Sequence, residues 1–375
     1  MPLALLVSIT VLAHVAYNGT RLTFSLAALS QGATPLTVGA LVSLMAALPM
    51  ALGAFSGRLV DRIGVRRPLI LGTAGVIAGV VLAALFPSLA VFPVVAAVVG
   101  SSFAIVHICA QHMVGEMSAP ARRRHNFSLL ALGFSISNFL GPTVSGLAID
   151  HFGFRATFCI LAAFACAALT ILFAHRAKLQ HKAHHTRDKR DRSALELLRD
   201  PELRRVLIVS GMLASAWDLF TFVMPIYGTA IGLSATTIGL ILGSFAAATF
   251  AVRALLPWIQ RHIHEWPLIT ATFAVACLAY AAFPLVRTVP LLAVLSFVLG
   301  FGLGATQPSI MALLYATAPA GRAAEAVGLR TVALNASTTV FPVLFGGLGA
   351  AVGIAPVFLA MAVALAGGAI LSRRR

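Results

Sequence analysis

Charged residues are scarce in this chain. Asp, Glu, Lys and Arg together make up 10% of its 375 residues, whereas hydrophobic residues make up 59%. Ordinary soluble domains carry about 25% charged residues and about half apolar residues. The composition therefore excludes an ordinary soluble domain and predicts a protein with many membrane-spanning segments.

Cysteines and the motifs of common enzymes are scarce as well. The four cysteines, Cys109, Cys159, Cys166 and Cys277, fall in apolar segments and show no metal-binding or redox spacing. We therefore interpret them as small packing residues. The sequence also has no P-loop, no cluster of acidic metal ligands and no nucleophile constellation. It predicts neither an enzyme nor an ATP-driven pump, and it predicts no metal or cofactor.

Long apolar segments, by contrast, are numerous. A helix needs about 20 residues to cross the hydrocarbon core of a bilayer, and twelve segments of the chain are of about this length or longer. The first has no basic region before it and is too long for a signal peptide, so we interpret it as an uncleaved span. The predicted fold class is all-α integral membrane, with twelve transmembrane helices. The predicted segments are 3–29, 37–57, 68–86, 90–114, 126–149, 155–175, 203–230, 236–256, 266–286, 289–315, 323–348 and 353–371.

The basic residues are distributed unevenly over the connections. If both termini are cytoplasmic, 24 of the 27 Lys and Arg residues fall on the cytoplasmic side, and only Arg21, Arg155 and Arg287 do not. This asymmetry follows the positive-inside rule, and it predicts a multi-pass protein of the cytoplasmic (inner) membrane with both termini in the cytoplasm. Attraction to anionic lipid accounts for the net charge of +16, so we expect membrane lipid as a partner and no nucleic acid.

One long polar segment divides the chain. It covers residues 176–202 and separates an N-terminal six-helix bundle, residues 1–175, from a C-terminal six-helix bundle, residues 203–375. Its histidines have no Cys nearby, and their neighbours are Lys and Arg. We therefore interpret this segment as a solvated cytoplasmic loop without a metal site.

The two predicted bundles repeat one another at an offset of 200 residues. Six spans in each half place the two repeats in parallel orientation. Parallel repeats related by an axis along the membrane normal are typical of transporters with a substrate site near the midplane. Identical residues at this offset are Thr37 and Thr237, Gly39 and Gly239, Pro142 and Pro342, Gly146 and Gly346, Gly153 and Gly353, and Phe158 and Phe358.

The segment GRLVDRIGVRR, residues 57–67, gathers four arginines and one acid. It lies between the second and third predicted spans and resembles the motif G-x-L-x-D-R-x-G-x-R-R/K of the major facilitator superfamily. The resemblance implies the fold of that family, two pseudo-symmetric six-helix bundles. It also implies that Asp61 and Arg62 latch this loop against the opposite half. For Arg66 and Arg67 a role as topology anchors is the alternative. The residues of this predicted conformational switch are Gly57, Asp61, Arg62, Gly64, Arg66 and Arg67.

A second resemblance concerns the fifth predicted span. Its segment GFSISNFLGPTVSG, residues 133–146, is similar to the motif that proton-coupled exporters of the same family carry in their fifth helix. Close packing of helices by small residues is the alternative interpretation. The Arg that those exporters have in the fourth helix is absent, since Ala96 and Ala97 stand there, and this departure counts against an exporter. The residues of this predicted helix-packing motif are Gly133, Gly141, Pro142 and Gly146.

Polar residues inside the spans predict where a substrate binds. Ionisable groups there cost about 2.5 to 3.5 kcal/mol on insertion scales, so each is a candidate functional group. His14, Asn18 and Arg21 share one face of the first span, and Asp218 corresponds to Asn18 at the repeat offset. Asp218 is the only acid near the middle of a predicted span, and we expect it to carry a coupling proton. A structural pair with Arg21 and direct substrate binding are the alternatives.

Further polar and aromatic residues are predicted to line the same cavity. The resemblance places the first and seventh spans around the central cavity of the fold. Two histidines, His14 and His107, are secondary candidates for the coupling proton. The further predicted cavity residues are Tyr17, Trp217, His107, Gln111, Gln307 and Asn335.

Together these features predict a secondary transporter that uses no cofactor, moves a small molecule and is coupled to protons. Proton-coupled export by antiport is the first hypothesis, favoured by the fifth-span motif and the aromatic residues of the cavity. Uptake of an organic anion by proton symport is the second, favoured by Arg21 and the absent fourth-span Arg. The third is a membrane sensor of transporter fold that binds its ligand without moving it. We expect a monomer.

Overall fold

The computed structural model describes residues 3–118, 120–175, 194–319 and 322–373, and in these ranges it holds helices and no strand. Ten of the described helices are long and apolar enough to cross a membrane. Two short 3-10 helices, η2 (Ala194–Arg199) and η3 (Phe283–Leu285), complete the described elements. The long helices are α1 (Leu3–Ser30), α2 (Pro35–Ile63), α3 (Arg66–Leu85), α4 (Phe92–Met117), α5 (Pro120–Ala174), α6 (Pro201–Ala230), α7 (Ala235–His262), α8 (Glu265–Ala282), α9 (Val289–Thr317), α10 (Ala323–Val352) and α11 (Ile354–Arg373).

The number of crossings depends on α2 and α5. α5 contains 55 residues and is broken at Gly153, where φ is 77° and ψ is 175°, so it holds the fifth and sixth predicted spans. α2 contributes a shorter apolar stretch, Pro35–Met50. With α5 counted as two crossings and α2 included, the described helices account for all twelve predicted spans. The predicted all-α membrane fold is confirmed.

The predicted repeat reappears in the backbone. Gly32 and Gly232 have φ values of 82° and 79°, and Gly153 and Gly353 have φ values of 77° and 88°. Glycine adopts such a conformation readily because it has no Cβ. These four glycines lie at one end of the helices, which we call the distal end. The end where α1 begins and α11 ends is called the terminal end.

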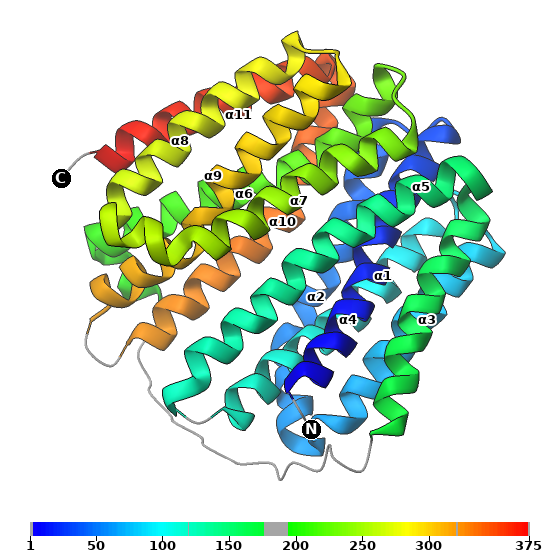
Figure 1. Cartoon of the computed structure of the whole chain (residues 1–375), viewed down its shortest axis with the longest axis horizontal. Coiled ribbons are helices and arrows are strands. Elements are labelled where there is room, and N and C mark those ends of the chain that lie inside the picture. The colour runs from blue at the N-terminus through cyan, green and yellow to red at the C-terminus, as the bar shows by residue number, and fades with distance from the viewer. Residues whose placement is uncertain (1–2, 119, 176–193, 320–321, 374–375) are drawn as a thin grey trace.

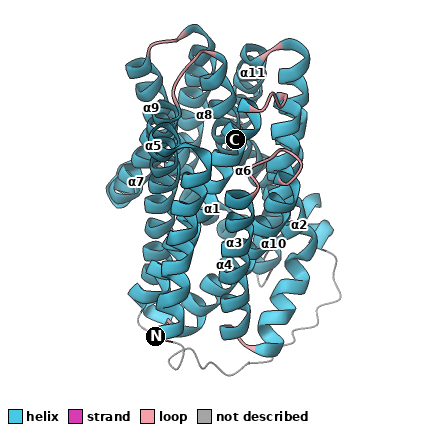
Figure 2. Ribbon diagram, turned by 90° about the vertical axis from the view of Figure 1, so that its right-hand side faces the viewer, coloured by secondary structure: helices cyan, strands magenta, loops and turns pink. Residues whose placement is uncertain are grey.

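The helices form two bundles with the same internal arrangement. α1 to α5 make the first bundle and α6 to α11 the second, drawn from blue to green and from green to red in Figure 1. α2 packs on α4 and α3 on α4 in the first bundle, as α7 packs on α9 and α8 on α9 in the second. Figure 2 shows the helices of both bundles running side by side along one general direction. These helix contacts thus recur between the two bundles.

The most extensive contacts between the two bundles are those of α5 with α7 and of α2 with α10, and α6 also touches α1 and α2. Near the distal end the contact is between backbones. A Cβ added to Gly39 in α2 would collide with the carbonyl oxygen of Pro342 in α10, and a Cβ added to Gly239 in α7 would collide with that of Pro142 in α5. These two contacts are related by the repeat offset. The α2–α10 and α5–α7 interfaces are therefore closed in the same way at the distal end.

Hydrogen bonds of Asp150 also join the bundles at the distal end. The carboxylate of Asp150 on α5 accepts hydrogen bonds from the backbone N–H groups of Ala235 (3.1 Å) and Thr236 (2.7 Å), the first residues of α7. The first N–H groups of a helix have no partner within the helix, and a carboxylate there is also favoured by the helix dipole. Asp150 therefore caps a helix that belongs to the opposite bundle.

We expect Asp150→Ala to raise the population of molecules whose distal ends are apart. Loss of an N-terminal cap costs about 1 kcal/mol, which corresponds to about a fivefold change in the ratio of the two populations. Distances between spin labels at Ala90 and Thr288, two exposed residues of distal loops on different bundles, measure this ratio. The exposed Cys159 and Cys166 are replaced beforehand so that only the intended sites are labelled.

Asp200 supplies the matched control for this prediction. Its carboxylate caps α6 by accepting from Glu202 N (2.8 Å) and Leu203 N (3.0 Å), and both groups belong to the same bundle. Asp200→Ala should lower stability by a similar amount and leave the label distances unchanged. Equal distance distributions in the two variants would show that the cap of Asp150 does not hold the bundles together.

Candidate functional site

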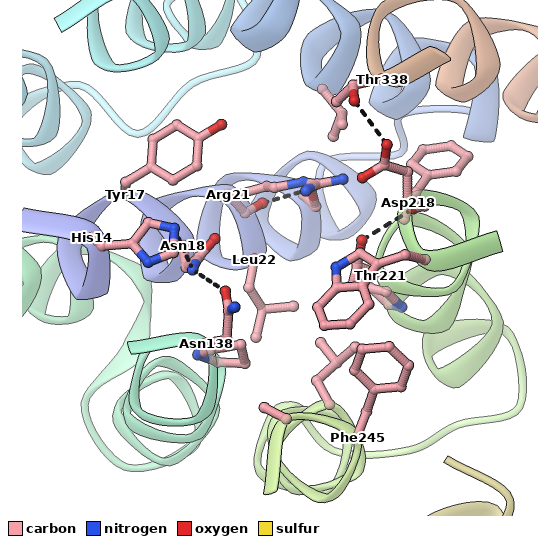
Figure 3. Close-up of a pocket in the computed structure, with 18 of the residues that line it drawn as sticks. His14, Tyr17, Asn18, Arg21, Leu22, Asn138, Asp218, Thr221, Phe245 and Thr338 are labelled. Atoms are coloured by element: carbon pink, nitrogen blue, oxygen red, sulfur yellow. Dashed lines mark hydrogen bonds between the residues drawn. The ribbon is translucent and has the colours of Figure 1, made fainter. Parts of the chain in front are cut away.

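A pocket of about 340 Å³ lies between the two bundles. This volume is at the lower end of the range of small-molecule sites. Helices of both bundles line it, and Figure 3 shows the principal side chains facing one another. The lining residues are His14, Tyr17, Asn18, Arg21, Leu22 and Ser25 of α1, Val42 of α2, His107 of α4, Phe134, Asn138 and Pro142 of α5, Trp217, Asp218, Thr221, Phe222 and Pro225 of α6, Leu242, Phe245 and Ala246 of α7, and Thr338 of α10.

α1 brings one polar face to the pocket. Asn18 donates through Nδ2 to Asn138 Oδ1 on α5 (2.7 Å) and lies 3.1 Å from His14 Nε2. The other ring nitrogen of His14 shares a hydrogen bond of 2.5 Å with Ser137 Oγ. His14 and Asn18 are therefore held by α5 of their own bundle. Arg21, one turn further along, extends across the pocket toward Asp218 (Figure 3).

Asp218 is held by its own bundle too. Its carboxylate oxygen Oδ2 accepts a hydrogen bond from Thr338 Oγ1 on α10 (2.7 Å), and its backbone oxygen accepts one from Thr221 Oγ1 (3.0 Å). Arg21 is close enough for its charge to act on the carboxylate. No hydrogen bond joins these two described side chains, and the alternative of a structural Asp218–Arg21 pair stays a prediction.

Aromatic rings make up much of the pocket wall. On the side of the first bundle, Phe103 stacks on Tyr17 at 4.4 Å and on His14 at 4.9 Å between ring centroids. His107 stacks on Phe134 at 4.9 Å. On the side of the second bundle, Trp217 meets Phe245 edge to face at 4.7 Å. The pocket is therefore flanked by apolar rings, with the polar groups of α1 and α6 between them.

Seven of the ten predicted cavity residues line this pocket, and three do not. Gln111 is exposed and bonds to the ring of His107. Gln307 accepts a hydrogen bond from Arg330 Nη2 (2.7 Å) within the second bundle. Asn335 lies on an exposed face of α10. Spacing along a helix cannot distinguish the face that meets the pocket from a face that meets a neighbouring helix, as at Gln307, or from an exposed face, as at Gln111 and Asn335. The seven that line the pocket are His14, Tyr17, Asn18, Arg21, His107, Trp217 and Asp218.

The predicted switch lies only partly within the described side chains. Gly57, Asp61 and Arg62 belong to α2, but their contacts fall outside the described part of the chain. Gly64 ends α2 with φ of 75°. Arg66 and Arg67 begin α3, where Arg66 is half-buried and Arg67 is exposed. The latch assigned to this segment stays a prediction.

The fifth-span motif packs α5 against its neighbours. A Cβ on Gly133 would lie 2.9 Å from side-chain atoms of Val7 and Val11 in α1, and one on Gly141 would lie 2.9 Å from Asn18 Cβ. A Cβ on Gly146 would collide with the carbonyl oxygen of Ala235 in α7. Pro142 takes part in the Gly239 contact and lines the pocket. The motif thus supplies close packing within the first bundle and between the bundles.

Asn138 and Thr338 are pocket residues that sequence reasoning missed. They are themselves related by the offset of 200, as are their partners Asn18 and Asp218. The hydrogen bond from Asn18 to Asn138 and the one from Thr338 to Asp218 therefore join corresponding positions, both at 2.7 Å, with donor and acceptor exchanged. The alignment of the two repeats contains the signal that could have found them. Asn138 lies one turn before Pro142, and Thr338 lies one turn before Pro342, so both are polar residues at the same position of the repeat.

Comparisons with known proteins agree with this architecture. Solved structures with the same fold include a peptide transporter POT in complex with sulfate, 16% identical, with a TM-score of 0.82 over 99% of this chain and 93% of that chain. A POT family transporter in complex with 5-aminolevulinic acid is 14% identical, with a TM-score of 0.81 over 98% of this chain and 94% of that chain. At such identities the likeness shows the fold alone.

The sequence itself also matches a family. No match was found among curated proteins. The family model described as Major Facilitator Superfamily matches residues 6–290, which is more than half of the chain. This match, the repeated six-helix bundles and the pocket between them agree with the resemblance seen in the motif at residues 57–67. The chain therefore belongs to the major facilitator superfamily.

Proposed function

We propose that this protein is a secondary active transporter that moves a small organic solute by alternating access and is coupled to protons. The observation that carries the proposal is the pocket between the two bundles, to which each bundle contributes one charged residue, Arg21 and Asp218. A transporter must bind its solute between two bodies that can move relative to each other. Both charges come from one chain, so a monomer suffices.

The orientation of the protein follows from its basic residues. The predicted topology assigns 24 of the 27 Lys and Arg residues to the side of the termini, so we place the terminal end in the cytoplasm and the protein in the cytoplasmic membrane. The backbone contacts of Gly39 and Gly239 then close the external side. The proposed cycle alternates this arrangement with one in which the distal ends separate and the terminal ends approach.

Asp218 is the proposed proton carrier. It is the single acid among the described residues that line the pocket. A carboxylate inside a span is costly, and Thr338 can hydrogen-bond to it in either protonation state because a hydroxyl both donates and accepts. Protonation from one side and release to the other then links a proton to each cycle of the two bundles.

The direction of transport is proposed from the positive charge that Arg21 brings to the pocket. The fifth-span motif favours export only if its role is specific to exporters, and the packing of Gly141 and Gly146 accounts for it without such a role. A cation in the pocket favours the second hypothesis, uptake of an organic anion together with a proton. We therefore propose uptake by proton symport, with export in exchange for protons as the competing candidate.

A two-stage experiment tests the proposal. Purified protein is screened by thermal shift for stabilising small organic compounds, and the flux of each hit is then measured in proteoliposomes. An imposed pH gradient should drive uphill movement of the hit, up to about tenfold for each pH unit if one proton is coupled, and a protonophore should abolish it. Binding without flux would identify the sensor of transporter fold instead.

A further inference from the structure

Among the described residues that line the pocket, Arg21 is the one with a buried polar side-chain atom that lacks a hydrogen-bond partner. Its Nη2 atom is buried and has no hydrogen-bond partner. The side chain extends from α1 into the pocket, toward the carboxylate of Asp218 (Figure 3). Leaving a buried charged donor without a partner costs more free energy than leaving a neutral one without a partner. Such a group points to a ligand that supplies the missing acceptor.

The other charges of the described helices do not supply that acceptor. Asp218 is the only acid among the described residues that line the pocket, and one of its carboxylate oxygens already accepts a hydrogen bond from Thr338. Two further arginines are largely buried in the helices but lie outside the pocket, and each finds neutral acceptors. Arg253 donates to Ala131 O and Ser135 Oγ on α5. Arg21 is therefore the uncommitted cation of the pocket.

The second of these arginines behaves in the same way. Arg330 donates to Ser210 Oγ and to Gln307 Oε1, each at 2.7 Å. The fold thus supplies at least two hydrogen-bond acceptors to each of these two described arginines. The exception at Arg21 coincides with the pocket, where a solute binds in the proposed cycle.

The chemistry of the guanidinium selects the ligand. Its planar fork of N–H donors matches a carboxylate, which accepts two parallel hydrogen bonds. A dianionic phosphate would need more positive charge than the single described cation of the pocket. The aromatic walls formed by Tyr17, Phe134, Trp217 and Phe245 suit an apolar body, and the volume of about 340 Å³ limits its size.

We infer that the substrate is a small organic monocarboxylate whose carboxylate binds Arg21 and whose apolar body lies between the aromatic walls. This inference rests on the proposed transport function and names its substrate class. A proton on Asp218 removes the negative charge that would otherwise compete for Arg21 and repel the anion. The anion and the proton therefore load together, and the pair carries no net charge across the membrane.

Matched acids and amides test this inference on the purified full-length protein. Benzoate, phenylacetate, 3-phenylpropionate and octanoate are each compared with their primary amides, which have nearly the same shape and no charge. Thermal shift and calorimetry should show binding of at least one acid and at least about tenfold weaker binding of its amide, because a hydrogen bond to a charged group contributes about 1.5 to 3 kcal/mol. Acid binding should strengthen as the pH falls from neutral, while the ligand is still ionised.

Three substitutions make the result specific to the pocket. Arg21→Gln should weaken acid binding by about tenfold or more, and Arg21→Lys, which keeps the charge, should weaken it less and shows whether the site still folds. Arg287→Gln removes a cation from an exposed distal position outside the pocket, and it should bind the acids as the wild type does.

Several results would overturn the inference. They are the absence of binding by every acid, equal binding of acids and amides, and unchanged acid binding in Arg21→Gln. Tighter binding of phenylalanine than of 3-phenylpropionate would show that the site recognises a zwitterion, with Asp218 as partner of the ammonium group. Uphill flux of an uncharged hit under a pH gradient would likewise end this inference while leaving the proposed function intact.

Discussion

Gly239→Val is expected to abolish transport and to hold the distal ends of the two bundles apart. The new side chain would begin with a Cβ that collides with the carbonyl oxygen of Pro142 and lies 3.2 Å from Gly146 Cα. Overpacking costs about 1 to 3 kcal/mol where side chains can adjust, but a backbone cannot move aside alone. We therefore expect a cost of at least about 3 kcal/mol to the closed arrangement, which shifts the ratio of closed to open distal ends by about 100-fold.

Solute flux and spin-label distances across the distal end measure this effect. The repeat supplies an equivalent variant, since Gly39 makes the corresponding contact with Pro342 at the α2–α10 interface. Gly39→Val should therefore act in the same direction as Gly239→Val. Gly211→Val is the control, because a Cβ at Gly211 in α6 meets no atom within 4 Å. Closed distal ends in Gly239→Val, or an equal loss of flux in Gly211→Val, would contradict the prediction.

The repeat explains why so much of this fold could be predicted from the sequence. Apolar segments long enough to span a bilayer have few alternatives to a helix, because every backbone polar group must be satisfied within the segment. Gly39 and Gly239 are identical at the repeat offset, as are their contacts Pro342 and Pro142. At these contacts the two backbones approach too closely for the glycines to carry a side chain. Such positions can be recognised from the sequence because their steric requirement is absolute.

The site could be predicted only in part, for a different reason. Asn18 and Arg21 share a helical face and both reach the pocket, as periodicity predicts. The partner of each polar group, however, depends on how neighbouring helices are rotated and how far they slide past one another. Gln307 meets Arg330 inside its bundle, whereas Thr338 meets Asp218 at the pocket, and no local signal separates these two cases. Only the register of the repeat does so, by pairing Thr338 with Asn138.

Asp218→Asn is expected to separate solute movement from the pH gradient. The amide has the shape of the carboxylate and can still bond to Thr338, so the pocket should stay assembled. It cannot bind and release a proton in the physiological range, so the cycle loses its coupling. The wild type should concentrate the solute by up to about tenfold for each pH unit. The variant should reach only equal concentrations on both sides, while exchange of labelled for unlabelled solute continues.

The comparison between uphill flux and exchange makes this prediction specific. A variant that merely damaged the pocket would lose both activities, whereas loss of the proton carrier removes only the first. Asp200→Asn deletes an acid at the start of α6, outside the pocket, and it should keep both. Asp218→Glu should keep coupling with altered affinity, since it retains a titrating group on a longer side chain. If Asp218→Asn still concentrates the solute under a pH gradient, the proton must travel through another pocket group, and His14 and His107 are then the residues to replace.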